Sequence, residues 1–276
     1  MTNQPRLSVA DFILGVYLKP LILVTNDDGV RAEGLQRLAQ ALESLGDVYM
    51  VAPLEERSAV SHALTIHDPV RIKKLSERVY AVRGTPADCV ILAVRRILPA
   101  KPDLVVSGIN HGANLGDDIM YSGTVAGARE ACYLDLPAFA ISQTLKDDHA
   151  ELGRPSRFAA LLAREILEKG LPLDTFLNVN IPAGECRGIR LTMQGSKLSK
   201  SNVYENADPR GRKYYWIGED RQGWPWASNN GSDYEAIAEA CISLTPLQRD
   251  QTHYQALKRM LDEGSYLSLE IPPTGA

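Results

Sequence analysis

The stretch that decides the fold is residues 21–29, which read LILVTNDDG. Its first four residues are apolar, as is typical of a strand buried on both faces in a parallel sheet. The strand ends in Asp27 and Asp28, whose adjacent carboxylates repel each other unless a cation, several N–H donors or water relieves the repulsion. Gly29 then permits a tight turn. Ligands bind at the carboxyl edge of an open α/β sheet, so both acids are candidate metal ligands, although a plain solvated turn fits the same residues.

A strand-helix-strand unit begins with this stretch. Leucines recur at three- and four-residue steps over residues 32–45, which predicts an amphipathic helix that ends at Gly46. Residues 48–52 (VYMVA) form a second predicted strand, closed by Pro53. Strands joined in this way lie parallel with a right-handed crossover. The polar loop at residues 54–65 therefore starts at the same sheet edge as the two acids.

The alternation of strands and helices continues to about residue 183. Alternating apolar residues predict a hairpin through residues 64–75 and 79–82, and Thr85, Pro86 and Asp88 predict a structural helix cap. We expect that helix to run to about Leu98. The remaining expected elements are strands at 103–107, 137–142, 176–181, 189–193, 214–217 and 241–246, and helices at 155–169 and around 254–261. The aromatic strand at 214–217 and the loop-like WPW at 224–226 suggest a protruding arm that contacts another subunit rather than stacking on bases.

Two further segments carry polar residues suited to a site. Residues 108–118 (GINHGANLGDD) are mostly glycine and polar, and include Asn110. Residues 121–128 (YSGTVAGA) read as the cap and first turn of a helix with small side chains. The free N–H groups and dipole of such a terminus attract anions, although an ordinary capped helix fits the motif equally well.

The oxygen donors at this sheet edge indicate phosphate chemistry. Asp27, Asp28, Ser58 and Asn110 together offer two carboxylates, a hydroxyl and an amide, a set that suits magnesium, manganese or calcium better than zinc. A divalent ion held there would polarise a P–O bond and activate water. With the helix terminus at residues 122–124 holding the other phosphate oxygens, the arrangement fits phosphomonoester hydrolysis.

The amino-acid composition of the chain limits the kinds of partner that it can bind. The chain has 276 residues, 45% of them hydrophobic and 23% charged, as expected for a globular protein. A net charge of −4 gives no general attraction to nucleic-acid polymers or anionic membranes. The four cysteines are too widely spaced for a zinc pair or a compact disulfide framework, so we expect reduced thiols and a cytoplasmic location. No apolar run is long enough to span a membrane.

Six motifs, in order along the chain, resemble the SurE family, the stationary-phase survival nucleotidases. They are residues 26–29 (NDDG), 56–58 (ERS), 84–89 (GTPADC), 106–110 (VSGIN) with 114–116 (NLG), 121–125 (YSGTV) and 243–246 (SLTP). The resemblance implies an α/β fold with a Rossmann-like, doubly wound, mostly parallel sheet, an extended C-terminal hairpin and a swapped segment. Residues 1–19 depart from the family, and we expect them to form an extension that is packed on the surface or poorly ordered. The remaining chain divides into an expected catalytic core at 20–183 and an oligomerisation region at 184–276.

The same resemblance implies a metal-dependent 5′-nucleotidase that acts on nucleoside 5′-monophosphates, and also on 3′-nucleotides and polyphosphate. It implies a homodimer or homotetramer with one divalent ion, magnesium or manganese, in each subunit. By the matched motifs, the metal ligands are Asp27, Asp28, Ser58 and Asn110, and the phosphate contacts are Asn114, Ser122, Gly123 and Thr124.

Some roles stay open at this point. Asp27 is expected to orient or deprotonate the attacking water, but direct attack by its carboxylate is the alternative. His62 and His111 lie in the two site loops, where each is either the proton donor to the leaving group or a surface histidine. A nucleotide-binding regulator without turnover and a metal-dependent glycosyltransferase are the competing functions. A dehydrogenase is disfavoured, because no Gly-x-Gly-x-x-Gly follows the first strand.

Overall fold

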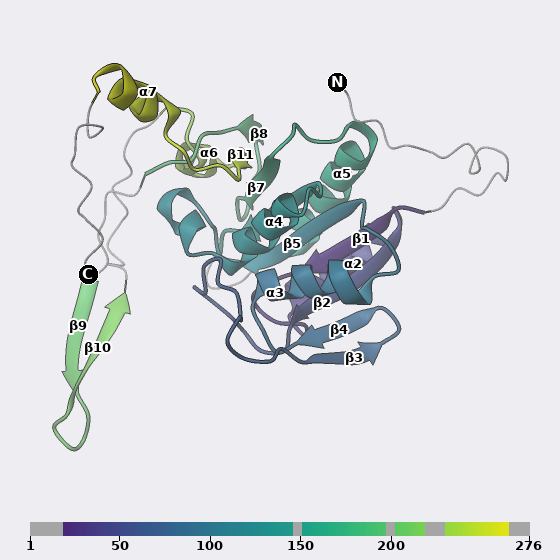
Figure 1. Cartoon of the computed structure of the whole chain (residues 1–276), viewed down its shortest axis with the longest axis horizontal. Coiled ribbons are helices and arrows are strands. Elements are labelled where there is room, and N and C mark those ends of the chain that lie inside the picture. The colour runs from purple at the N-terminus through teal and green to yellow at the C-terminus, as the bar shows by residue number, and fades with distance from the viewer. Residues whose placement is uncertain (1–18, 146–150, 197–201, 219–229, 265–276) are drawn as a thin grey trace, which may run out of the picture.

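The structure is a computed structural model, and it describes residues 19–145, 151–196, 202–218 and 230–264 (Figure 1). Apart from Lys19, the expected extension at residues 1–19 lies outside the described residues, and so does the WPW segment at 224–226. No described helix is both long enough and apolar enough to cross a membrane.

A nine-stranded sheet forms the body, in the order β3-β4-β2-β1-β5-β6-β7-β11-β8. Its strands are β1 (Leu21–Thr25), β2 (Asp47–Pro53), β3 (Ile72–Ser76), β4 (Val79–Val82), β5 (Leu104–His111), β6 (Ala138–Gln143), β7 (Thr175–Ile181), β8 (Gly188–Leu191) and β11 (Cys241–Gln248). Only the β3–β4 and β7–β11 pairs are antiparallel. The predicted parallel sheet is thus confirmed, and β1 lies between β2 and β5.

Helices cover both faces of this sheet. One face carries α2 (Glu33–Leu42) and α5 (Gly153–Lys169), and the other carries α3 (Pro86–Leu92) and α4 (Gly123–Tyr133). Short π and 3-10 turns, η1 (Ala93–Ile97) and η2 (Gly116–Met120), follow α3 and precede α4.

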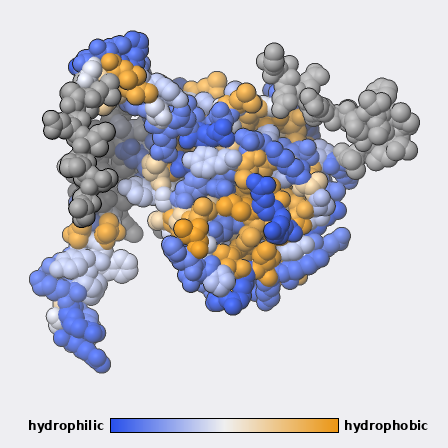
Figure 2. Space-filling model, in the orientation of Figure 1, coloured by the Kyte–Doolittle hydropathy of each residue, from blue (hydrophilic) through white to orange (hydrophobic). Residues whose placement is uncertain are grey.

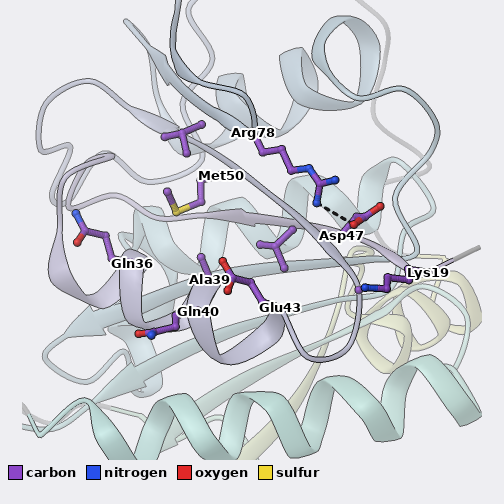
Figure 3. Close-up of a pocket in the computed structure, with 11 residues that line it drawn as sticks. Lys19, Gln36, Ala39, Gln40, Glu43, Asp47, Met50 and Arg78 are labelled. Carbon is purple, nitrogen blue, oxygen red and sulfur yellow. Dashed lines mark hydrogen bonds and ion pairs between the residues drawn. The ribbon is translucent and has the colours of Figure 1, made fainter.

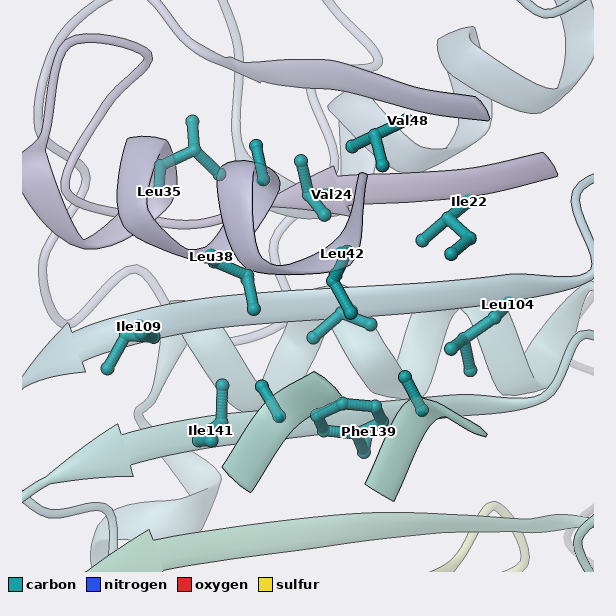
Figure 4. Close-up of a cluster of buried hydrophobic side chains, with 14 of the residues drawn as sticks. Ile22, Val24, Leu35, Leu38, Leu42, Val48, Leu104, Ile109, Phe139 and Ile141 are labelled. Carbon is teal, nitrogen blue, oxygen red and sulfur yellow. The ribbon is translucent and has the colours of Figure 1, made fainter. Parts of the chain in front are cut away.

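The central strand β1 is buried on both faces, as its run of apolar residues predicts. Ile22 and Val24 pack under α2 against Leu38 (Figure 4), whereas Leu23 faces the cluster around α3 and α4. Each fully buried side chain of this size contributes about 1.5–3 kcal/mol. The two acidic residues that follow β1 are therefore anchored to the most firmly packed part of the sheet.

Part of the C-terminal region belongs to the large sheet, and part of it forms a separate hairpin. β8 and β11 extend the sheet beyond the boundary expected at residue 183. β9 (Asn202–Ala207) and β10 (Lys213–Gly218) pair only with each other and form a hairpin that stands away from the body (Figure 1). Short helix α6 (Asp233–Ala238) precedes β11, and α7 (Tyr254–Asp262) closes the described chain.

The prediction of strand through residues 64–71 is wrong. The hairpin starts only at Ile72, because Asp68-Pro69 interrupts the segment and tertiary bonds hold its beginning. Thr65 donates from N and Oγ1 to the Asp88 carboxylate at 3.0 and 2.6 Å, and Thr85 Oγ1 donates to the Ala63 carbonyl at 2.8 Å. The predicted capping box of Thr85 and Asp88 is present, so the cap residues hold this loop as well as α3.

One helix ends earlier than predicted, and another ends where the sequence predicts. α2 ends at Leu42 rather than at residue 45. The helix expected to run to about Leu98 continues from α3 through η1 to Ile97, and Leu98 N donates to Ala93 O at 2.9 Å. It ends at Leu98 because that residue precedes a proline, which disfavours a helical backbone. All four cysteines are free, as predicted, although Cys186 is only half-buried.

Candidate metal and phosphate site

The turn after β1 is built by Asn26. Its side-chain amide donates to the Gly29 carbonyl at 3.1 Å and accepts from the Gly29 N–H at 3.2 Å. Gly29 has φ +100°, a conformation that a residue with a β-carbon rarely adopts. The sequence Asn-Asp-Asp-Gly thus forms a turn closed by its own side chain, which fixes the backbone of Asp27 and Asp28.

Asp27 meets the N-terminus of α4. Thr124 Oγ1 donates a hydrogen bond to Asp27 Oδ1, and the Asp27 carbonyl accepts from Arg57 N at 2.7 Å. A β-carbon on Gly123 would lie 2.8 Å from Asp27 Oδ2. Gly127, one turn later, packs as closely on Ser107 of β5. Both glycines therefore allow α4 to lie close to Asp27 and to β5.

Asp28 is the least satisfied acid of the site. Burial, the Asp27 carboxylate and the Glu56 carboxylate, in that order, raise the pKa of Asp28 to about 7. Its Oδ2 is buried without a hydrogen-bond partner. Burial also raises the pKa of Asp27, and the hydrogen bond from Thr124 opposes that rise. An unpaired buried carboxylate oxygen beside two other acids is the environment that a bound cation stabilises.

Ser58 lies on an exposed loop after β2. Ser58 Oγ donates to Glu56 Oε1 at 2.5 Å, and the loop returns to the body through Ser61, whose N and Oγ donate to the carbonyls of Tyr121 and Met120 at 2.9 and 2.6 Å. The loop carrying Ser58 is thus tied to the residues just before the α4 terminus.

The two histidines differ in their surroundings. His62 Nε2 lies 2.7 Å from Glu130 Oε2 of α4, and its ring centroid lies 5.3 Å from that of Tyr133. His111 is exposed at the end of β5. The contact of His62 with Glu130 thus ties the Ser58 loop to α4, and no signal in the sequence identifies Glu130 as its partner.

Asn110 and Asn114 belong to the end of β5 and the loop after it. β5 pairs with β1 through Thr25 and Ser107, so Asn110 lies at the same sheet edge as the two acids, and its Nδ2 donates to Gly112 O at 2.8 Å. Asn114 is held inside the sheet edge by three side chains. These are Ser142, Asn178 and Asn180, at 2.8–3.0 Å.

The donor set fits a hard divalent ion. Asp27, Asp28, Ser58 and Asn110 come from three adjacent strand ends and offer only oxygen atoms. Within the described residues, no group of three or more His, Cys, Asp or Glu side chains gathers as a metal cluster, and Asp27 and Asp28 are the two charged members of this donor set. Two carboxylates with neutral oxygens match magnesium or manganese coordination.

Several contributors were missed from the sequence. Glu56 adds a third negative charge near Asp28, and Asn178 and Asn180 anchor Asn114. The asparagines left a signal, since a polar residue alternates with apolar ones in a fully buried strand.

The groove in Figure 3, between α2 and the start of β2, is lined by Asp47 and Arg78 and belongs to the opposite edge of the sheet.

Known proteins match this chain over most of its length. The family described as "Survival protein SurE" matches residues 22–201. The chain belongs to the SurE family. A protein of Pelobacter propionicus named "5'-nucleotidase SurE" is 49% identical over 240 residues, covering 86% of this chain and 96% of the relative. A protein of the same name from Syntrophotalea carbinolica is 51% identical over 241 residues, covering 86% and 95%.

A solved SurE structure shares the fold. The crystal structure of the SurE protein from Aquifex aeolicus matches with a TM-score of 0.79 at 41% identity, covering 89% of this chain and all of that one. The SurE resemblance inferred from the six motifs is thereby confirmed, and so is the predicted fold class.

Proposed function

We propose that this SurE-family chain is a divalent-metal-dependent phosphatase that hydrolyses nucleoside 5′-monophosphates to nucleoside and phosphate. The observation that carries the proposal is the pair of adjacent acids after β1, with buried Asp27 held by Thr124 of α4 and Asp28 Oδ2 left without a partner. The names of the SurE relatives support the nucleotide substrate. Asp27, Asp28, Ser58 and Asn110 would hold one magnesium or manganese ion in each subunit. When bound, the ion would polarise the phosphoryl oxygen and make water a stronger nucleophile.

The residues of the chain bind and orient the phosphate. The backbone N–H groups of Gly123 and Thr124 lie in the first turn of α4, where the helix dipole favours an anion. Ser122 Oγ caps this helix by accepting from Val125 N at 3.1 Å. Asn114, fixed by its amide contacts, is proposed as a further phosphate contact. Because these groups recognise the phosphate itself, we extend the proposal to 3′-nucleotides and short polyphosphate.

Asp27 is proposed to orient the attacking water or accept its proton, because its carboxylate is fixed by Thr124. An isotope experiment separates this from attack by the aspartate. In a single turnover in labelled water, label should enter phosphate directly. Label appearing first in the Asp27 carboxylate would identify the aspartate as the nucleophile.

A homodimer or homotetramer is proposed for the assembly. The β9–β10 hairpin exposes Tyr214, Tyr215 and Trp216, and α7 exposes hydrophobic atoms along one side (Figure 2). Aromatic and apolar groups of this kind favour contact with another subunit. The free cysteines favour a cytoplasmic location.

The test is phosphate release from adenosine monophosphate after exhaustive chelation and re-addition of magnesium, manganese, cobalt or calcium. We expect chelation to abolish phosphate release and added metal to restore it. Asp27→Asn should raise the activation free energy by several kcal/mol, which lowers turnover about a thousandfold or more. Full activity in the presence of chelator would refute the metal-dependent phosphatase. Tight nucleotide binding without phosphate release would favour the regulatory alternative.

A further inference from the structure

The two peptide groups on either side of Gly116 are gripped from the C-terminal region of the chain. Asp233 Oδ2 accepts from Gly116 N at 2.8 Å, and Gln194 Nε2 donates to Gly116 O at 2.9 Å. Tyr234 OH donates to Leu115 O at 3.2 Å. Both polar groups of Gly116 are therefore bound by residues about 80 to 120 positions further along the chain.

Asp233 is the centre of this grip. Its side chain is fully buried, and its other oxygen, Oδ1, accepts from Gly195 N and Tyr234 N, both at 2.9 Å. A buried carboxylate that accepts from three backbone N–H groups stays in one orientation, because any rotation would leave a buried donor unpaired. We call Gln194, Asp233 and Tyr234 the clasp.

Space around Gly116 is as tight as its hydrogen bonding. Gly116 has φ +51°, and a β-carbon there would lie 2.5 Å from the Tyr234 ring and 2.9 Å from Gly195 O. The loop can therefore take only one position relative to the clasp.

The place of Gly116 in the chain gives the clasp its significance. Gly116 begins η2, and Ser122 N at the far end of that turn donates to Asp118 O at 3.1 Å, just before α4. Upstream, Asn114 is fixed by the sheet. The clasp thus fixes the middle of the segment between Asn110, a proposed metal ligand, and Gly123, in the proposed phosphate cradle.

The clasp is also the root of the β9–β10 hairpin. Met193 N donates to Gly231 O, and Asp233 N donates to Met193 O, both at 2.9 Å. The segment at Met193 leads toward β9, and the segment at Gly231–Asp233 follows β10. The two segments therefore lie on either side of the β9–β10 hairpin in the sequence.

We propose that Gln194, Asp233 and Tyr234 are positioning residues that set the phosphate cradle through the two peptide groups on either side of Gly116, and so couple the root of the β9–β10 hairpin to the active site. The inference rests on the proposed phosphatase function. It assigns these residues no contact with substrate.

The test uses Tyr234→Phe, which removes the hydrogen bond to Leu115 O, and Gln194→Ala, which removes the hydrogen bond to Gly116 O. We expect KM for adenosine monophosphate and the inhibition constant of inorganic phosphate to rise about two- to tenfold in each variant, the equivalent of one hydrogen bond. The Mn²⁺ dissociation constant, measured by titration calorimetry, should change less than about twofold, since the clasp contacts none of the proposed metal ligands.

Ser232→Ala is the matched control. Ser232 Oγ caps α6 next to the clasp by accepting from Glu235 N at 3.3 Å, and it has no bond to the gripped peptide. We expect this variant to lose thermal stability while KM and the phosphate constant stay at the wild-type values. A clasp with only a structural role would make Tyr234→Phe and Gln194→Ala behave like this control, and that result would overturn the inference.

Phosphate binding by calorimetry, in the presence of Mn²⁺, separates the two proposals. If the wild type binds phosphate but releases none from nucleotide, the proposed phosphatase function is wrong. In that case the phosphate dissociation constants of Tyr234→Phe and Gln194→Ala, compared with the wild-type value, still test the clasp. A wild type that neither binds phosphate nor turns over would overturn both.

Discussion

At the scale of single residues, the charge of Asp28 opposes folding of the metal-free protein. Its folded pKa of about 7 lies above the unfolded value of 3.8, so the metal-free native state binds more protons than the unfolded state between these values. The stability of the metal-free protein must therefore fall as pH rises through this window.

Asp28→Asn removes that charge. We expect the metal-free variant to be more stable than the wild type at about pH 8 by roughly 1–2 kcal/mol, a value reduced for partial solvent screening. Urea unfolding in the presence of chelator measures this difference. Adding Mn²⁺ should reverse the order, because only the wild type keeps both carboxylates. Equal stabilities in chelator at every pH would contradict the buried charge.

The hydrogen bond from Thr124 to Asp27 acts on the ionised carboxylate. Because this bond lowers the pKa of Asp27, its loss in Thr124→Val should raise that pKa further. The acidic limb of the kcat/KM profile should then move to higher pH, and kcat/KM should fall about tenfold or more, as for a hydrogen bond to a charged group. Thr124→Ser keeps the donor and serves as the control. An unshifted acidic limb in the valine variant would exclude Asp27 as the titrating group.

At the scale of elements, the Ser58 loop is held in a conformation that it would not take alone. Ala59 and Ser61 have φ of +54° and +56°, and each such residue costs about 1 kcal/mol or more. The bonds of Ser61 to the residues before α4 and of His62 to Glu130 offset that cost.

His62→Ala should therefore loosen the loop. We expect Mn²⁺ binding to weaken about two- to tenfold, with a smaller effect on turnover at saturating metal. His111→Asn, at an exposed position, should leave metal affinity and turnover unchanged. If His62→Ala instead keeps metal affinity but loses both turnover and the basic limb of the pH profile, His62 is the proton donor to the leaving group and not a residue that only holds the loop.

Elements with a local cause were predictable from sequence. The apolar run of β1, the cap of α3 and the small residues at the start of α4 each depend on neighbours within a few positions. In residues 64–71, Asp68-Pro69 is a local signal against a strand, but the hold of Asp88 on Thr65 comes from a partner 23 positions away and has no local signal. The insertion of β11 between β7 and β8 is likewise set by tertiary pairing.

The same distinction applies to the candidate site. Its acids stand out because two adjacent carboxylates follow a buried strand. Glu56, the His62–Glu130 pair and the Asp233 clasp do not stand out, since each acts through a partner that is distant in sequence or through a loop whose path the sequence does not fix.

At the scale of the whole molecule, α7 is the element with the clearest need of a partner. None of its residues is buried, although Leu257 and Leu261 share one face. An amphipathic helix with its apolar face in water gains free energy by covering that face, and a second copy of the chain is the proposed cover.

Leu257→Asp combined with Leu261→Asp should weaken the assembly. Loss of central apolar contacts costs about 2 kcal/mol or more per site, which is roughly thirtyfold in the association constant, and the new charges add a desolvation cost. Light scattering over a concentration series should show a smaller mass, while circular dichroism stays unchanged because these side chains contribute nothing to the core of the subunit. Gln255→Glu, on the polar side of the same helix, should leave the mass as in the wild type. A double variant that keeps the wild-type mass at every concentration would mean that α7 lies outside the subunit contact, and the aromatic β9–β10 hairpin would then have to carry the assembly.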